Sequence, residues 1–323
     1  MTLNRRTALG LAAVAAFPVR AVAQQQAPAD PVEVIRLWPG AAPGGEHVAI
    51  TPQVTERSTD PTFHDRFARY TTDPIMTVLR PDRPNGASLL LIPGGGYKWA
   101  VVDKEGLDCA RVFAAAGVTC FVLRYRLPGD GWAAGPDAPL QDAQRALRLV
   151  RSQAAAHGLD PARVAVLGAS AGGHLAGMLT ARMDATYAAL DGADAVPHRP
   201  DLSILLYPVA TMADPHVHAG SRLELFGEAP TAEMIARYSL ERMDWTGRPP
   251  TFLLHAMDDA AVPVENSLSL LTTLRAAGVP AEAHLFQEGG HGFGIRLIAG
   301  RPAAAWPELA LAWAARHGWI TQT

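Results

Sequence analysis

One serine of this chain stands in a setting that favours nucleophilic chemistry. Ser170 is the centre of Gly168-Ala169-Ser170-Ala171-Gly172, which follows an apolar stretch at 164–167 and opens a helical pattern at 171–183. A sharp turn between a strand and a helix lifts such a hydroxyl above a sheet and places backbone N–H groups behind it. The G-x-S-x-G spacing by itself is weak evidence, because it can arise by chance in a chain of this length. The setting between a strand and a helix is what makes Ser170 a candidate nucleophile rather than a helix cap.

A serine hydroxyl becomes a good nucleophile only beside a base that a third group orients. His291 lies in Gly289-Gly290-His291-Gly292-Phe293, directly after the last expected strand, and is the candidate base. Asp258 and Asp259 follow the preceding strand, and spacing alone does not choose between them as the orienting acid. The order serine, aspartate, histidine matches one known form of the Ser-His-Asp triad. Other histidines, such as His174 one helical turn after the serine, are expected to pack inside.

A run of glycines supplies candidate donors for a developing oxyanion. Ile92-Pro93-Gly94-Gly95-Gly96-Tyr97 ends another apolar strand, and its glycines allow backbone N–H groups to approach a negative oxygen closely. We therefore predict an oxyanion hole formed by the N–H groups of Gly95, Gly96 and Ala171. The alternative is a plain glycine turn. A phosphate-binding loop is excluded, because neither G-x-G-x-x-G nor G-K-[ST] follows.

Short β-branched or leucine-rich runs alternate with helical patterns from about residue 75 onward. This alternation predicts an α/β fold with a mostly parallel central sheet and helices on both faces. The expected strands are 75–79, 88–92, 118–123, 164–167, 202–207, 252–255 and 283–286, and the expected helices are 105–116, 142–156, 171–183, 264–277 and 303–316. Two segments fit this scheme poorly, 127–139 and 211–250. Both follow strands, so they are expected to form walls of the site, with 211–250 as a lid-like insertion.

The composition is that of a compact globular protein. The 323 residues are 49% hydrophobic and 18% charged, with a formal net charge of −3. No basic run follows the first residues, which argues against nucleic acid as a partner. Cys109 and Cys120, the only cysteines, are expected to be buried free thiols, because one falls in a predicted helix and the other in the following strand.

The N-terminus has the three regions of a signal peptide. Asn4-Arg5-Arg6-Thr7 is basic, residues 8–17 are apolar, and Ala21-Val22-Ala23 has the form of a cleavage site. Arg5-Arg6 resembles a twin-arginine signal, although a general secretory route stays open. The apolar stretch is too short to span a bilayer of about 30 Å. We expect a signal peptide at 1–23, an N-terminal extension at 24–74, and one domain at 75–323 that works in the periplasm or outside the cell.

Between about residues 75 and 313, the chain resembles the α/β-hydrolase superfamily, and within it the bacterial carbohydrate-esterase-like branch that includes acetyl xylan esterase-like proteins. The resemblance rests on the glycine triplet, on Gly168 to Leu175, on the turn from Asp258 to Pro263, and on Gly290-His291-Gly292. It implies Asp259 as the acid, because the distance from Asp259 to Val262-Pro263 matches the acid turn of related hydrolases. Pro93 stands where many esterases have histidine, which leaves a backbone oxyanion role intact.

The resemblance also implies a function, the hydrolysis of small acyl esters without metal or cofactor. Acetyl groups on plant carbohydrate are the implied substrates. Tyr97, Trp99 and Trp132 are candidates for stacking on sugar rings, although aromatic side chains also fill cores. An arylformamidase-like amidase and a non-catalytic carbohydrate-binding protein are the alternatives. A serine peptidase of related fold is less well matched, because the β domain that usually gates such enzymes has no room before residue 75.

Overall fold

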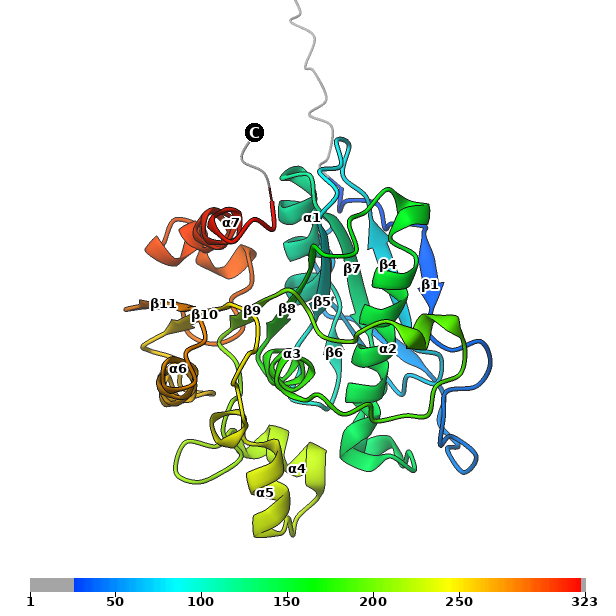
Figure 1. The fold of residues 1–323 in the computed structure, drawn as a ribbon. Coiled ribbons are helices and arrows are strands. Elements are labelled where there is room, and N and C mark those ends of the chain that lie inside the picture. Colours follow the sequence, from blue (N-terminus) through cyan, green and yellow to red (C-terminus); the bar gives the residue numbers. More distant parts are fainter. Residues whose placement is uncertain (1–25, 321–323) are drawn as a thin grey trace, which may run out of the picture.

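The computed structural model describes residues 26–320, so the expected signal peptide at 1–23 lies outside the described residues. An eight-stranded sheet forms the centre, with strands in the order β1-β4-β7-β5-β8-β9-β10-β11 (Figure 1). Its strands are β1 (Val34–Arg36), β4 (Ile75–Leu79), β5 (Ser88–Ile92), β7 (Thr119–Arg124), β8 (Val164–Ala169), β9 (Leu202–Leu206), β10 (Thr251–Ala256) and β11 (Ala281–Phe286). The six strands from β7 to β11 in this order are parallel, and β1 and β4 pair antiparallel.

Helices cover both faces of the sheet, which confirms the predicted α/β class. Side chains of α2 (Ala138–Ser152), α3 (Ala171–Ala181) and α6 (Glu265–Ala276) pack into one hydrophobic core. Those of α1 (Asp108–Ala115) and α7 (Trp306–Arg316) pack into a second core on the opposite face. Strands β5, β8, β9 and β10 are buried along their whole length, since they lie between the two cores. This burial explains why their sequences are apolar without alternation.

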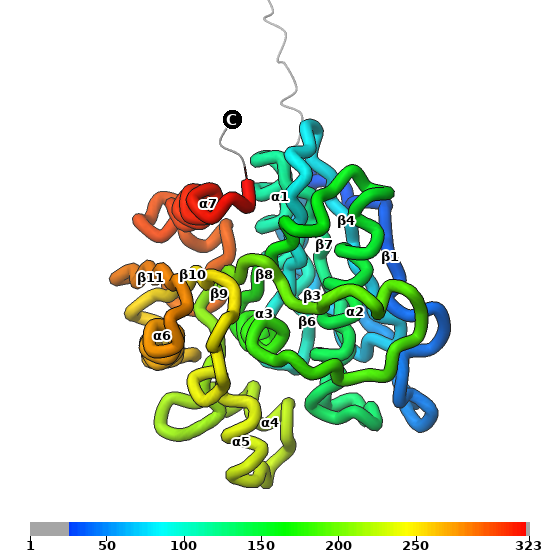
Figure 2. Tube along the Cα trace, in the orientation of Figure 1, coloured from blue at the N-terminus to red at the C-terminus, as the bar shows by residue number. Residues whose placement is uncertain are grey.

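The segment before residue 75 was expected to be an N-terminal extension, but it contributes strands and buried side chains to the fold. β1 adds an edge strand to β4, at the opposite edge of the sheet from β11 (Figure 2). Trp38 is 3% exposed, and its indole nitrogen donates to Asp142 of α2 at 2.8 Å. A second, three-stranded antiparallel sheet is formed by β2 (Gln53–Glu56), β3 (Arg66–Arg69) and β6 (Ala100–Val101). The expected boundary at residue 75 therefore divides a continuous packing unit.

The two irregular segments, 127–139 and 211–250, differ in whether they line the cavity that contains Ser170. Segment 211–250 contains α4 (Ala219–Phe226) and α5 (Ala232–Tyr238), which project together beyond α3 and α6 in Figures 1 and 2. Residues of α4 line the cavity that contains Ser170, whereas no residue of 127–139 does. Only one of the two expected walls is therefore present.

Two further expectations concern cysteines and membranes. Cys109 and Cys120 are both free and buried, as predicted. Among the helices described between residues 26 and 320, none combines the length and apolarity that crossing a bilayer requires.

Candidate active site

The turn around Ser170 is strained, and glycines make it sterically possible. Ser170 has φ 56° and ψ −122°, a conformation that L-residues rarely adopt. A Cβ on Gly168 would lie 2.2 Å from the carbonyl oxygen of Gly172, and a Cβ on Gly172 would lie 2.1 Å from that of Ile92 in β5. Side chains at these positions would drive the helix away from the sheet. The G-x-S-x-G pattern thus reflects the close contact between α3 and the ends of β5 and β8.

The three candidate triad residues form one hydrogen-bonded chain. The Ser170 hydroxyl lies 2.8 Å from Nε2 of His291, and Nδ1 of His291 lies 2.7 Å from Oδ2 of Asp259. The other carboxylate oxygen of Asp259 accepts the N–H groups of Ala261 and Val262 at 2.9 and 2.8 Å. Burial acts to raise the pKa of Asp259, but hydrogen bonds from His255 and His291 outweigh it and hold the pKa well below its usual range. This carboxyl group is therefore ionised and suited to orient the imidazole.

The structure separates the roles of the two neighbouring aspartates. Asp258 accepts the backbone N–H of Gly290 at 2.8 Å, which fastens the loop that carries His291. Asp259 alone contacts the imidazole. The preference for Asp259 as the acid therefore agrees with the geometry.

A second histidine contacts the same carboxylate. Nε2 of His255 lies 3.2 Å from Oδ2 of Asp259 and 3.0 Å from the carbonyl oxygen of Val262, and its Nδ1 lies 2.8 Å from the hydroxyl of Ser267. His255 is fully buried in β10. It therefore helps to hold the Asp259 carboxylate in position. Its place at the end of a strand in the sequence did not reveal this role.

The glycine triplet lies beside the serine with free donors. Gly95 and Gly96 have φ 129° and 65°, and both line the cavity that contains Ser170. Among the described residues 26–320, no acceptor takes either N–H, whereas the N–H of Gly94 is bound by Glu105 at 3.0 Å. Ala171 is the first residue of α3, where N–H groups have no partner within the helix. All three predicted oxyanion donors therefore lie next to Ser170, the candidate nucleophile.

Glu105 and Tyr207 join the glycine triplet to the loop of His291. Glu105 belongs to the π-helical turn η1 (Asp103–Leu107), and one of its oxygens accepts the N–H of Gly94. Its other oxygen accepts the Tyr207 hydroxyl at 3.1 Å, and that hydroxyl accepts the N–H of Gly294 at 3.1 Å. The Tyr207 ring also packs edge-on against His291, with ring centroids 5.2 Å apart. Neither side chain was singled out from the sequence.

A cavity of about 440 Å³ opens above these groups. It is lined by Ser170 and His291, the candidate nucleophile and base, and by Gly95 and Gly96. His218 and residues of α4 also line the cavity, and the His218 ring is stacked with the His291 ring, with centroids 6.5 Å apart. In the described part of the chain, no three His, Cys, Asp or Glu side chains gather in the way that a metal ion requires.

Of the three aromatic residues proposed to bind substrate, only Trp99 lines this cavity. Tyr97 is 2% exposed, and its hydroxyl donates to Nδ1 of His174 at 2.7 Å. Trp132 is 5% exposed and packs under the guanidinium of Arg126, whose carbon lies 4.8 Å from the ring centroid. The expectation that Tyr97 and Trp132 stack on sugar rings is therefore wrong, because both side chains complete the core.

His174 packs inside, as predicted, and must be neutral there. Its Nε2 lies 2.7 Å from the carbonyl oxygen of Tyr238, and burial lowers its pKa from 6.5 to about 4. Below pH 6.5 the unfolded chain gains a proton that the folded chain does not, so stability is complete above this pH and falls toward pH 4. The His174→Gln variant lacks this titration. Between pH 7 and pH 4.5, we expect the unfolding free energy of the wild type to fall by about 2 kcal/mol more than that of His174→Gln. Urea denaturation at both pH values measures the difference, and equal losses would contradict a neutral imidazole.

Comparisons with known proteins bear on the family and the fold of the chain. The chain matches a family model described as the alpha/beta hydrolase fold over residues 89–295, more than half of its length. It is 34% identical over 227 residues to endo-1,4-beta-xylanase B of Butyrivibrio fibrisolvens and 31% identical over 227 residues to acetylxylan esterase of Xylanibacter ruminicola. Each match covers 68% of this chain, but only 34% and 44% of these relatives. The chain thus spans less than half the length of either one.

A solved structure is similar over nearly the whole chain. It is an acetyl ester-xyloside bifunctional hydrolase from Caldicellulosiruptor lactoaceticus, with 30% sequence identity and a TM-score of 0.71. The match covers 93% of this chain and 100% of that one. The strained turn at Ser170 and the chain order of the loops that carry Ser170, Asp259 and His291 are consistent with these matches. The family match and this coverage show that the chain belongs to the α/β-hydrolase family.

Proposed function

We propose that this protein is a serine esterase that removes small acyl groups, acetyl groups above all, from carbohydrate esters. The observation that carries the proposal is the continuous hydrogen-bonded chain from Ser170 through His291 to Asp259, at the floor of a cavity with unoccupied backbone donors. The names of the similar proteins support the choice of an acetyl ester and of a carbohydrate. Export to the periplasm belongs to the same proposal, and its basis is the sequence of residues 1–23.

The proposed reaction is a two-step acyl transfer. Ser170 Oγ attacks the ester carbonyl carbon while Nε2 of His291 takes the hydroxyl proton. The N–H groups of Gly95, Gly96 and Ala171 stabilise the oxyanion, and His291 returns the proton to the leaving alcohol. Water then attacks the acyl-serine in the same way and releases the acid. Asp259 stays ionised throughout and stabilises the imidazolium, for which its low pKa fits it.

One substrate panel tests the proposal. We expect a fluorophosphonate to label Ser170, and p-nitrophenyl acetate, acetylated xylan and an acetylated monosaccharide to be hydrolysed, with kcat/KM compared across acetate, butyrate and octanoate. An N-formyl arylamine serves as the amide arm, because an arylformamidase-like amidase has the same triad. Faster turnover of this amide than of the aryl acetate would overturn the esterase assignment. Failure of a folded protein to label would favour the non-catalytic carbohydrate-binding alternative.

A further inference from the structure

The lysines of this chain are few and share one location. Of its 28 lysine and arginine residues, only Lys98 and Lys104 are lysines, and both line the cavity that contains Ser170. Lys98 follows the oxyanion loop, and its ammonium lies 5.4 Å from the centroid of the Trp99 ring. Lys104 lies in η1, and its nitrogen would be 3.4 Å from a Cβ on Gly292, next to the candidate base. Both compact, mobile ammonium groups are thus close to the reacting centre.

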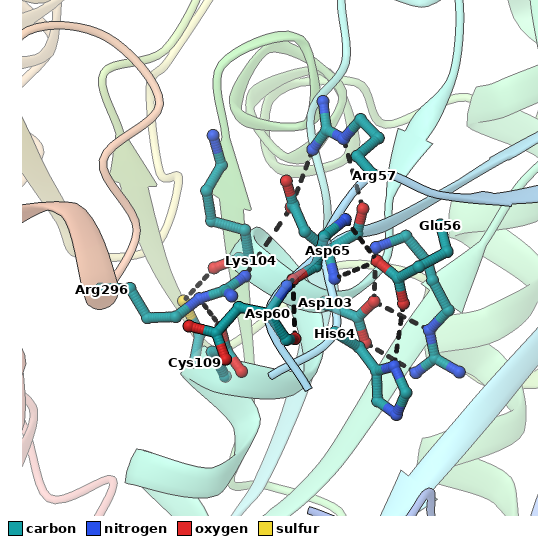
Figure 3. A network of polar contacts seen from close by, with 12 residues as sticks. Glu56, Arg57, Asp60, His64, Asp65, Asp103, Lys104, Cys109 and Arg296 are labelled. Carbon is teal, nitrogen blue, oxygen red and sulfur yellow. Dashed lines mark hydrogen bonds and ion pairs between the residues drawn. The ribbon is translucent and has the colours of Figure 1, made fainter. Parts of the chain in front are cut away.

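Neither ammonium is neutralised by a neighbouring carboxylate. Over residues 26–320, the ion pairs of this protein all have arginine or histidine as the cation. Figure 3 shows the Lys104 side chain extending away from the polar network around it, with no contact drawn at its nitrogen. Cations without a partner beside a catalytic cavity leave a positive potential that is available to a ligand.

A third cation, Arg57, reaches the same cavity from the second sheet. Its Nε donates to the backbone oxygen of Asp65 at 3.3 Å and its Nη2 to the Asp65 carboxylate at 2.8 Å (Figure 3). The guanidinium lies over the Phe67 ring at 5.5 Å, and Phe67 in turn packs on Trp99 at 5.0 Å. These contacts hold Arg57 in place while its Nη1 keeps no partner in the described part of the chain.

The cavity lining also contains two carboxylates, and neither forms an ion pair with the lysines in the described residues. Glu105 is buried, and its two oxygens accept the N–H of Gly94 and the hydroxyl of Tyr207. Glu224 lies on the wall formed by α4, where its Oε2 would be 3.5 Å from a Cβ on Gly129. Arg57, Lys98 and Lys104 are thus grouped around Trp99 on one side of the cavity, which we call the cation side; Arg57 is paired with Asp65, and the two lysines are the cations there without an ion pair in the described residues.

We propose that this cation side binds a carboxylate on the alcohol part of the substrate, so that the preferred substrates are acyl esters of acidic sugars, that is, of saccharides that carry a uronic acid. The Trp99 ring offers an apolar surface for a sugar ring beside the cations. The acyl group faces Ser170 while the uronate lies against Lys98, Lys104 and Arg57. This inference rests on the proposed esterase function and adds the charge of the substrate to it.

A matched substrate pair isolates the charge. One substrate is an acetylated xylo-oligosaccharide with a glucuronic acid side group, and the other is the same molecule with the uronic acid converted to its uronamide, which is neutral and has a similar shape. At low ionic strength, we expect kcat/KM to be about tenfold higher for the uronate, as a few partly exposed charge pairs would give. The ratio should fall as salt is added, because exposed charges are screened.

Three variants connect this ratio with the named cations. Lys98→Gln and Lys104→Gln should each lower the uronate-to-uronamide ratio by about threefold, and Lys104→Arg, which keeps the charge, should restore most of it. Arg275→Gln is the matched control, since Arg275 is an exposed cation in the last turn of α6 and does not line the cavity. It removes the same net charge and should leave the ratio unchanged.

Two results would overturn the inference. A wild-type ratio of one or less, with p-nitrophenyl acetate still hydrolysed, shows that the cavity does not select a carboxylate although the esterase assignment holds. An equal drop in the ratio in Arg275→Gln and Lys104→Gln assigns the preference to the net charge of the protein rather than to this site. Absence of p-nitrophenyl acetate hydrolysis by the folded, unlabelled wild type, in contrast, refutes the proposed function itself.

Discussion

Replacing Ser170 by alanine is expected to lower kcat for p-nitrophenyl acetate by about 10⁴-fold or more, because the acyl-enzyme can no longer form. The remaining rate would come from the backbone donors and from substrate binding alone. Steady-state kinetics at saturating ester measure the loss. Ester turnover within tenfold of the wild type would show that another group attacks the carbonyl.

Folding of Ser170→Ala has to be shown separately. The alanine keeps the Cβ in the same strained turn, so its melting temperature should stay close to that of the wild type. A fluorophosphonate should label the wild type and leave the folded variant unlabelled. Loss of activity together with loss of the folded state would not support a nucleophilic role.

The Asp259→Asn variant should lose about 10⁴-fold in kcat while the fold is kept. An amide that donates to Nδ1 of His291 holds the imidazole in the wrong tautomer, and it also removes the charge that stabilises the imidazolium. Asp258→Asn is the matched control on the adjacent residue, since its amide oxygen can still accept the N–H of Gly290. Its loss should stay below about tenfold, as for one exposed hydrogen bond. A larger loss in Asp258→Asn than in Asp259→Asn would reverse the assignment of the acid.

The strands of the central sheet that have long apolar sequences were predicted, whereas the short polar strands were missed. The buried strands β5, β8, β9 and β10 are continuous apolar runs and were all expected. β2 was missed because Gln53–Glu56 is exposed along its whole length and has no buried face to leave a pattern. β1 was missed because three residues at a sheet edge carry too little periodicity. Such edge strands are specified by pairing with distant residues, which sequence spacing does not contain.

The residues of the candidate site also fall into those that a local sequence pattern predicted and those that it missed. Ser170, His291 and the glycines were found because each stands in a local motif with a strict steric or chemical requirement. Glu105, Tyr207 and His255 act through contacts between distant segments, so no local pattern marks them. Tyr97 and Trp132 were misassigned because their position beside or after the oxyanion loop does not reveal which way a side chain points. The only sequence signal for Lys98 and Lys104 was compositional, because lysine is rare in this chain and both lysines lie close together in the sequence.

The hydrogen bonds from Gly94 through Glu105 and Tyr207 to Gly294 connect the loop of the proposed oxyanion donors with the loop of the candidate base His291. A displacement of the first loop must stretch a bond to the second, so neither loop can drift out of alignment alone. Helix α4 takes no part in these three hydrogen bonds. Substitutions at Leu223 or Glu224, on its cavity side, are therefore expected to alter which alcohols fit while Ser170 and His291 stay aligned.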